Sequence, residues 1–114
     1  MPYINTTTTE KIDAAALKSL KEDFANAITL IPGKSEEWLM LNFTGEADMF
    51  FRGTSEGGAV IIEVAILGSA KKEELMALTS ALSASAEKNL GVAKDRIYVK
   101  FTEHTSWGHA GYMF

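Results

Sequence analysis

Two stretches of the chain repeat apolar residues at steps of three and four positions, the spacing that gathers side chains on one face of an α-helix. The first begins near Asp13, whose side chain can accept from the free backbone donors of a first turn, and ends at Pro32-Gly33. The second follows Gly68-Ser69, and Gly91 ends it. Their apolar faces are Leu17, Leu20, Phe24, Ile28 and Ile31 in the first, and Leu75, Leu78, Leu82, Ala86 and Leu90 in the second.

Four other segments have the patterns of β-strands. Residues 2–8 contain Ile4 and the first three of four consecutive threonines, β-branched residues that suit a pleated surface. Residues 59–67 are almost continuously apolar, as in a strand covered on both faces. Residues 45–58 are polar and Gly-rich, and we expect a loop with a short edge strand. The remaining two strands alternate apolar residues: Leu39, Leu41 and Phe43 within residues 38–44, and Ile97, Val99 and Phe101 near the end of the chain.

The two halves of the chain superpose without gaps when 58 is added to the residue number, so that Leu20 maps to Leu78 and Phe43 to Phe101. Each half reads as strand, helix, turn and strand. We therefore predict one domain over residues 1–114, with repeats at about 2–44 and 59–102. Its fold is α/β in the two-layer α+β arrangement: two βαβ units form a four-stranded mixed sheet with both helices on one face. The apolar residues of 59–67 should not face water on the other side of the sheet. We therefore predict a homo-oligomer in which other copies of the chain bury that face.

Charge and composition remove several classes of function. The net charge of −4, with scattered lysines, argues against a nucleic-acid partner, which needs a basic surface. The chain has no cysteine, so disulfides, thiolate catalysis and Cys-ligated zinc are excluded. No apolar run approaches the roughly 18 residues of a membrane span, and the N-terminus lacks the features of a signal peptide. We expect a cytoplasmic protein with no membrane partner.

The first residues, Met1-Pro2-Tyr3, hold the chemistry of most interest. Removal of Met1 would leave Pro2 as a free secondary amine fixed at the head of a strand. The structural alternative is that Pro2 simply begins a strand, a position where proline is tolerated. Among other polar residues, His104 and His109 could suggest a metal pair, but the tail offers no third ligand in register, and we predict no metal.

The N-terminal Pro2, the two βαβ repeats, Gly33-Lys34, the segment 95–98 (Asp-Arg-Ile-Tyr) and the Gly- and Phe-containing end together resemble the macrophage migration inhibitory factor family of the tautomerase superfamily. The similarity covers essentially the whole chain. No single motif is specific to the family, but the order and spacing of the motifs are. The resemblance implies a homotrimer whose sheets form a barrel, with active sites at subunit interfaces. It also implies keto-enol tautomerisation of phenylpyruvate, or a similar small aromatic α-keto acid, without a cofactor.

Carried over position by position, the resemblance makes Pro2 the catalytic base and Lys34 the cation that faces the substrate carboxylate. Ile66 matches a residue whose backbone amide faces the same carboxylate, and Tyr98 matches a tyrosine given by the neighbouring subunit. An apolar pocket and the charge of Lys34 would both lower the pKa of the Pro2 amine, which suits a base at neutral pH. The aromatic walls of the pocket would be Trp38 and Phe114.

Several positions depart from the pattern of the family. Lys100 stands where the best-known members have asparagine, and a second cation there would strengthen anion binding or alter selectivity. Gly108-His109 stands where Gly-Trp is common, and Trp107 is our candidate for the missing aromatic. The other reading is a cytokine-like protein that is released without a signal peptide and binds a receptor, with tautomerase activity incidental. The sequence has no signature that decides between the two.

Overall fold

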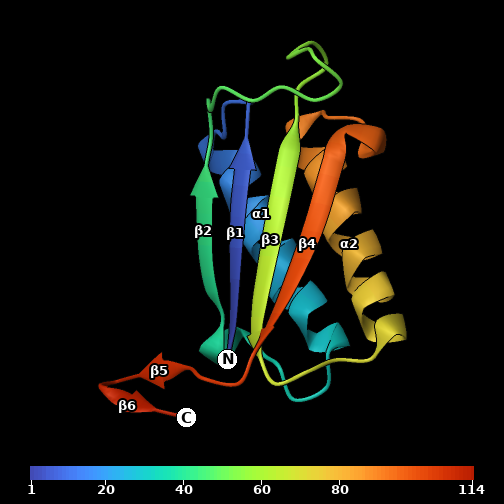
Figure 1. Cartoon of the computed structure of the whole chain (residues 1–114). Helices are drawn as coiled ribbons and strands as arrows, with labels where there is room; N and C mark the ends of the chain where they lie inside the picture. The colour runs from blue at the N-terminus through green and yellow to red at the C-terminus, as the bar shows by residue number, and fades with distance from the viewer.

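The computed structural model describes all 114 residues, which form two layers: a four-stranded sheet with two helices on one face (Figure 1). This confirms the predicted fold class. Neither helix is long and apolar enough to cross a membrane. The elements are β1 (Pro2–Thr8), α1 (Ala14–Ala27), β2 (Met40–Thr44), β3 (Val60–Leu67), α2 (Lys72–Leu90), β4 (Ile97–His104), β5 (Gly108–His109) and β6 (Tyr112–Met113), with 3₁₀ turns at Ile28–Leu30, Glu36–Trp38 and Lys94–Arg96.

The strand order is β2-β1-β3-β4. β1 runs parallel to β2 and β3 runs parallel to β4, while the central pair, β1 and β3, is antiparallel. Each parallel pair is connected through one helix, so the two predicted βαβ units and the mixed sheet are both present. Both helices lie behind the sheet in the view of Figure 1.

The predicted helix ends are largely correct. Asp13 Oδ1 accepts a hydrogen bond from the backbone N–H of Ala16 at 2.8 Å, as expected of an N-cap. Gly91 ends α2 with φ of 69°, a left-handed conformation that glycine adopts without strain. The first helix stops at Ala27 and continues as a 3₁₀ turn, and Ile31 beyond it is still only 2% exposed.

The core lies between the sheet and the helices. Alternate residues of β1 and β3 point into it, which is the period of two expected of strands. The opposite face of the sheet is partly polar: Asn42 donates to Asn5 at 2.8 Å, and Lys100 pairs with Glu63 at 3.3 Å. Within one chain, β3 is thus covered on one face only. The largest fully buried side chains include Ile4, Leu20, Phe24, Ile28, Ile62, Ile66, Leu78 and Leu82.

Two local predictions were wrong, and one element was not predicted. Trp38 belongs to a 3₁₀ turn, and β2 begins at Met40 rather than at residue 38. The loop 45–58 has no edge strand, only an isolated bridge between Phe51 and Thr54. The tail, for which no element was predicted, forms the hairpin β5–β6, in which His109 pairs with Tyr112. The 3₁₀ turn spans three residues and each strand of the hairpin two, and such short elements show little periodicity.

Arg96 holds the loop 45–58 in place. Its guanidinium donates hydrogen bonds to the backbone carbonyls of Gly58, Phe51 and Thr54, the last two at 3.1 and 2.7 Å. It also lies over the Phe51 ring, 5.4 Å from the ring centre, in a cation–π contact. The rigid fork of arginine suits several carbonyls at once, because its five N–H donors point in fixed directions.

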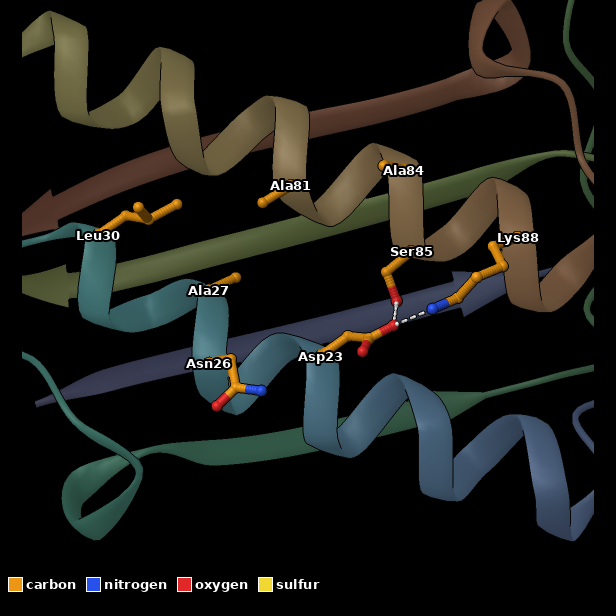
Figure 2. Close-up of a pocket in the computed structure, with 8 residues that line it drawn as sticks. All are labelled: Asp23, Asn26, Ala27, Leu30, Ala81, Ala84, Ser85 and Lys88. Atoms are coloured by element: carbon orange, nitrogen blue, oxygen red, sulfur yellow. Dashed lines mark hydrogen bonds and ion pairs between the residues drawn. The ribbon is translucent and has the colours of Figure 1, made fainter.

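A polar cluster around Asp23 of α1 links the two helices (Figure 2). Asp23 Oδ2 accepts from the Ser85 hydroxyl at 2.7 Å and pairs with Lys88 Nζ at 3.0 Å; both partners lie on α2. The Ser85 hydrogen bond, followed by that of Lys88, holds the pKa of Asp23 below its ordinary value. The groove that contains this cluster includes none of the candidate site residues.

Replacing Asp23 by asparagine should lower the free energy of unfolding at pH 7 by about 0.5–1 kcal/mol, because the amide oxygen still accepts from Ser85 and solvent screens the lost charge. Because the folded-state pKa is depressed, this stabilisation is complete above the unfolded-state pKa of about 3.9 and disappears as the pH falls through the folded-state value. Urea unfolding of both proteins at one concentration, from about pH 2 to pH 7, measures the difference. Ser80→Ala, at an exposed serine of α2, is the control. A loss that does not change with pH would contradict the assignment.

Candidate active site

One end of the sheet brings together segments that are distant in the sequence. The beginning of β1, the beginning of β2, and the ends of β3 and β4 all lie at the end where Figure 1 marks the N-terminus. The pairing of Tyr3 with Met40 places the residues before β2 beside the N-terminus, and the pairing of Pro2 with Ile66 places the end of β3 on its other side. The hairpin β5–β6 follows β4 at the same end.

Met1, Lys34 and Leu67 meet at this end of the sheet. The backbone N–H of Leu67 donates to the Met1 carbonyl at 3.1 Å. Lys34 Nζ donates to the Leu67 carbonyl at 2.8 Å. Gly33, with φ of 82°, turns the chain immediately before the lysine, a conformation that a side chain would strain. The Lys34 side chain therefore lies against the end of β3.

The α-amino group of Met1 has a pKa below its ordinary value of 8.0. Burial is the largest cause, because a charged amine loses hydration there, and the charge and hydrogen bonding of Lys34 lower the pKa further. In this chain the Pro2 nitrogen is an amide, since Met1 is attached to it. Pro2 itself is buried. Its nitrogen is one residue farther along the backbone than the Met1 nitrogen, at most about 3.8 Å away.

Ile66 does not have the position that the resemblance implied for it. The side chain of Ile66 is 1% exposed and belongs to the core. Antiparallel pairs alternate between hydrogen-bonded and non-hydrogen-bonded. Met1 and Leu67 form a hydrogen-bonded pair, so Pro2 and Ile66 form the other kind, and the N–H of Ile66 points toward β4. The backbone amide that faces the N-terminus is that of Leu67.

Leu67 is therefore the residue that reasoning from the sequence missed. The alternation of apolar core positions along β3 could have identified Leu67. Val60, Ile62, Val64 and Ile66 share one parity and fill the core, which leaves Leu67, directly before Gly68, with the other parity. The carry-over of Ile66 from the family pattern did not take this alternation into account.

An aromatic cluster lies beside the same end of the sheet. The rings of Trp38 and His109 meet edge to face, with centres 5.3 Å apart, and the His109 and Phe114 rings are 6.3 Å apart. Trp107 instead contacts His104, at 5.8 Å, while its carbonyl accepts from the Phe114 N–H at 2.7 Å. Two of the predicted aromatic walls, Trp38 and Phe114, are thus brought together through His109, whereas the Trp107 ring lies against another residue. We define the aromatic wall as Trp38, His109 and Phe114.

Tyr98 and Lys100 are distant from Pro2 within one chain. Tyr98 pairs with Ile61 and Pro2 with Ile66, so five residues of β3 separate them, about 16 Å along the sheet. The Tyr98 ring lies edge-on to Phe51 with centres 5.3 Å apart, and it is 59% exposed. Lys100 forms an ion pair with Glu63. If either residue serves a site at Pro2, another copy of the chain must supply it.

The sequence model of the family described as macrophage migration inhibitory factor (MIF) matches residues 1–113. The chain belongs to the MIF family. The match spans both βαβ units and the hairpin, and MIF homologues belong to the tautomerase superfamily. No curated protein matches the sequence closely enough to add to this.

Solved structures, two of them described as MIF proteins, have the same fold. The crystal structure of Leishmania major MIF2 superposes with a TM-score of 0.92 at 23% identity, over 100% of this chain and 97% of that one. The MIF homologue of Prochlorococcus marinus gives 0.88 at 27% identity, over 98% of both chains. Pt0534, solved after inactivation by 2-oxo-3-pentynoate, gives 0.80 at 21% identity, over 96% of this chain and 93% of that one.

Replacing Lys34 by glutamine in the chain that retains Met1 should raise the pKa of the N-terminal amine, because a nearby positive charge and its hydrogen bond are removed. The pKa should remain below 8.0, since burial is the larger cause. The pH dependence of the Met1 amine signal by NMR, or of its reaction with an acylating reagent, measures this. Lys72→Gln, at an exposed lysine of α2, is the matched control. An unchanged pKa in Lys34→Gln would show that the lysine does not act on the amine.

Proposed function

We propose that this MIF-family protein is a keto-enol tautomerase for phenylpyruvate-type 2-oxo acids, with the Pro2 nitrogen as general base after Met1 is removed. The observation that carries the proposal is the partly buried α-amine beside Lys34, whose pKa is lowered by burial and by that lysine. An amine that is largely unprotonated near neutral pH can accept a proton from carbon. Removal of Met1 would give the same neighbourhood to the secondary amine of Pro2.

In the proposed reaction, the Pro2 nitrogen takes a proton from the carbon next to the ketone. The electron pair of the broken C–H bond forms the C=C bond of the enolate, and the proton is then returned to the oxygen. Lys34 and the Leu67 N–H hold the carboxylate. Removal of Met1 frees this N–H, because its present acceptor is the Met1 carbonyl. No step requires a metal or an organic cofactor.

The proposal includes a homotrimer in which a neighbouring subunit supplies Tyr98, whose hydroxyl would donate to the carboxylate or to the enolate oxygen. Both ends of the sheet expose apolar side chains that a second copy could cover: Tyr98 and Phe50 at one end, Trp38 and Met40 at the other. β2 and β4 are also edge strands with unpaired backbone groups on their outer sides. These features favour a head-to-tail contact between copies, which closes into a ring.

One similar protein supports the substrate class. Pt0534 is inactivated by 2-oxo-3-pentynoate. This reagent has a carboxylate next to a ketone, the two groups that Lys34, Leu67 and Tyr98 would bind here.

The first experiment compares processed wild type, verified by intact mass, with Pro2→Gly on phenylpyruvate. We expect kcat/KM to fall about 100-fold or more, the range for loss of a positioned base. The wild-type kcat/KM should rise with pH through a pKa below the ordinary α-amino value of about 8, because the base works only when unprotonated. Lys34→Gln should raise KM, and Lys72→Gln should change neither constant. Processed wild type that is inactive on several 2-oxo acids would sink the tautomerase proposal and leave the reading of a binding protein.

Mixing subunits tests whether the site is shared between copies. Pro2→Gly and Tyr98→Phe proteins should each be weak alone. After they are unfolded and refolded together, some mixed trimers contain a site with an intact Pro2 from one subunit and an intact Tyr98 from the next, so activity should rise above the sum of the two. Separate refolding followed by mixing is the control. Full activity of Tyr98→Phe, or sedimentation of the wild type as a monomer, would contradict the shared site.

A further inference from the structure

Tyr98 has one aromatic neighbour within its own chain. Its ring meets the ring of Phe51 edge to face, with centres 5.3 Å apart and an interplanar angle of 83°. The rest of the Tyr98 side chain is largely open, since 59% of the residue is exposed. Exposed side chains change rotamer within nanoseconds when nothing holds them. The Phe51 ring is therefore the contact that restrains the orientation of the Tyr98 ring.

The Phe51 ring is itself held by two arginines. Arg52 and Arg96 both place their guanidinium groups over it, with Cζ 5.0 and 5.4 Å from the ring centre. Arg52 also pairs with Asp95 at 3.1 Å. Asp95 and Arg96 belong to the turn directly before β4. The segment that carries Tyr98 thus also holds the ring against which Tyr98 rests.

The backbone of the loop is fixed independently of the Phe51 side chain. Phe51 and Thr54 exchange backbone hydrogen bonds of 3.0 and 3.2 Å, which close a tight turn. Arg96 donates to three backbone carbonyls of the same loop. None of these hydrogen bonds uses the side chain of Phe51. A leucine at this position should therefore remove the aromatic ring and leave the turn in place.

From these contacts we propose that Phe51 is a positioning residue for the tautomerase reaction, which orients the Tyr98 ring so that its hydroxyl points into the site of the neighbouring copy. The inference rests on the proposed function, because the role of Tyr98 comes from it. Phe51 does not touch the substrate and transfers no proton. It acts through Tyr98, because a ring that is already oriented loses less conformational freedom when its hydroxyl donates to the carboxylate or to the enolate oxygen.

A double-mutant cycle in processed protein tests this role. In Phe51→Leu, kcat/KM for phenylpyruvate should fall about two- to tenfold, the factor that corresponds to the energy of an aromatic pair. The loss should appear in the same constant, kcat or KM, that Tyr98→Phe changes. In the Tyr98→Phe background, Phe51→Leu should have no further effect. An equal loss in both backgrounds would overturn the inference, since a merely structural role does not depend on the Tyr98 hydroxyl.

Two variants control for a general disturbance. Phe51→Tyr keeps the aromatic ring and should retain the wild-type constants. Phe101→Leu removes a ring from the same strand as Tyr98, but from the side that packs against the core. Its effect should be the same with and without the Tyr98 hydroxyl. A Phe51→Tyr protein as impaired as Phe51→Leu would contradict the assignment of the effect to the ring.

The NMR signals of the Tyr98 ring separate this inference from the proposed activity. These signals are identified by their absence in Tyr98→Phe. The ring current of Phe51 shifts them, so they should move in Phe51→Leu and stay in place in Phe101→Leu. An inactive wild type whose Tyr98 signals still respond to Phe51→Leu would contradict the tautomerase proposal but support the orientation of Tyr98 by Phe51. Unchanged signals in Phe51→Leu would overturn the inference whatever the activity.

Discussion

The antiparallel register between β1 and β3 is the constraint on which the candidate site depends. Because Pro2 lies opposite Ile66, Met1 lies opposite Leu67, and the alternation of an antiparallel ladder makes the Leu67 N–H the one that points at the N-terminus. A shift of one residue would exchange the two faces of β3, so that core residues such as Val64 and Ile66 would face outward. The burial of alternate β3 side chains under the two helices therefore fixes the position of the N-terminal nitrogen.

Most of the fold could be predicted because it is repeated and periodic. Helices of 14 and 19 residues present their apolar face several times, so that Phe24 and Leu82 were assigned to the core correctly. The connections that position Trp38 and His109 have no such redundancy. A 3₁₀ turn of three residues and a hairpin with two-residue strands are determined by contacts between distant segments, such as the ring of Trp38 against that of His109.

The site was predicted less completely than the fold for a related reason. Pro2 was proposed because it lies at the end of the chain, and Lys34 was carried over from the family pattern, in which it follows the glycine of the helix stop. Ile66 was also carried over by its position along the chain, and that position cannot show which backbone amide faces a neighbouring strand. Tyr98 lies at the other end of the sheet from Pro2, so whether it serves the same site depends on contacts between copies, which the fold of one chain does not determine.

Met1 blocks the proposed chemistry in two independent ways. It turns the Pro2 nitrogen into an amide, which has no basic electron pair, and its carbonyl occupies the Leu67 N–H that would otherwise face a carboxylate. A single cleavage removes both obstacles and leaves Lys34 beside the new amine. In the proposed site the lysine would attract the substrate carboxylate and would disfavour protonation of the Pro2 amine, as it does for the Met1 amine here. Binding of the carboxylate would offset part of the lysine's charge, so the pKa of the base should be lower in the free protein than in the complex. A base whose pKa rises when substrate binds accepts the proton from carbon more readily in the complex, which couples recognition of the carboxylate to proton transfer.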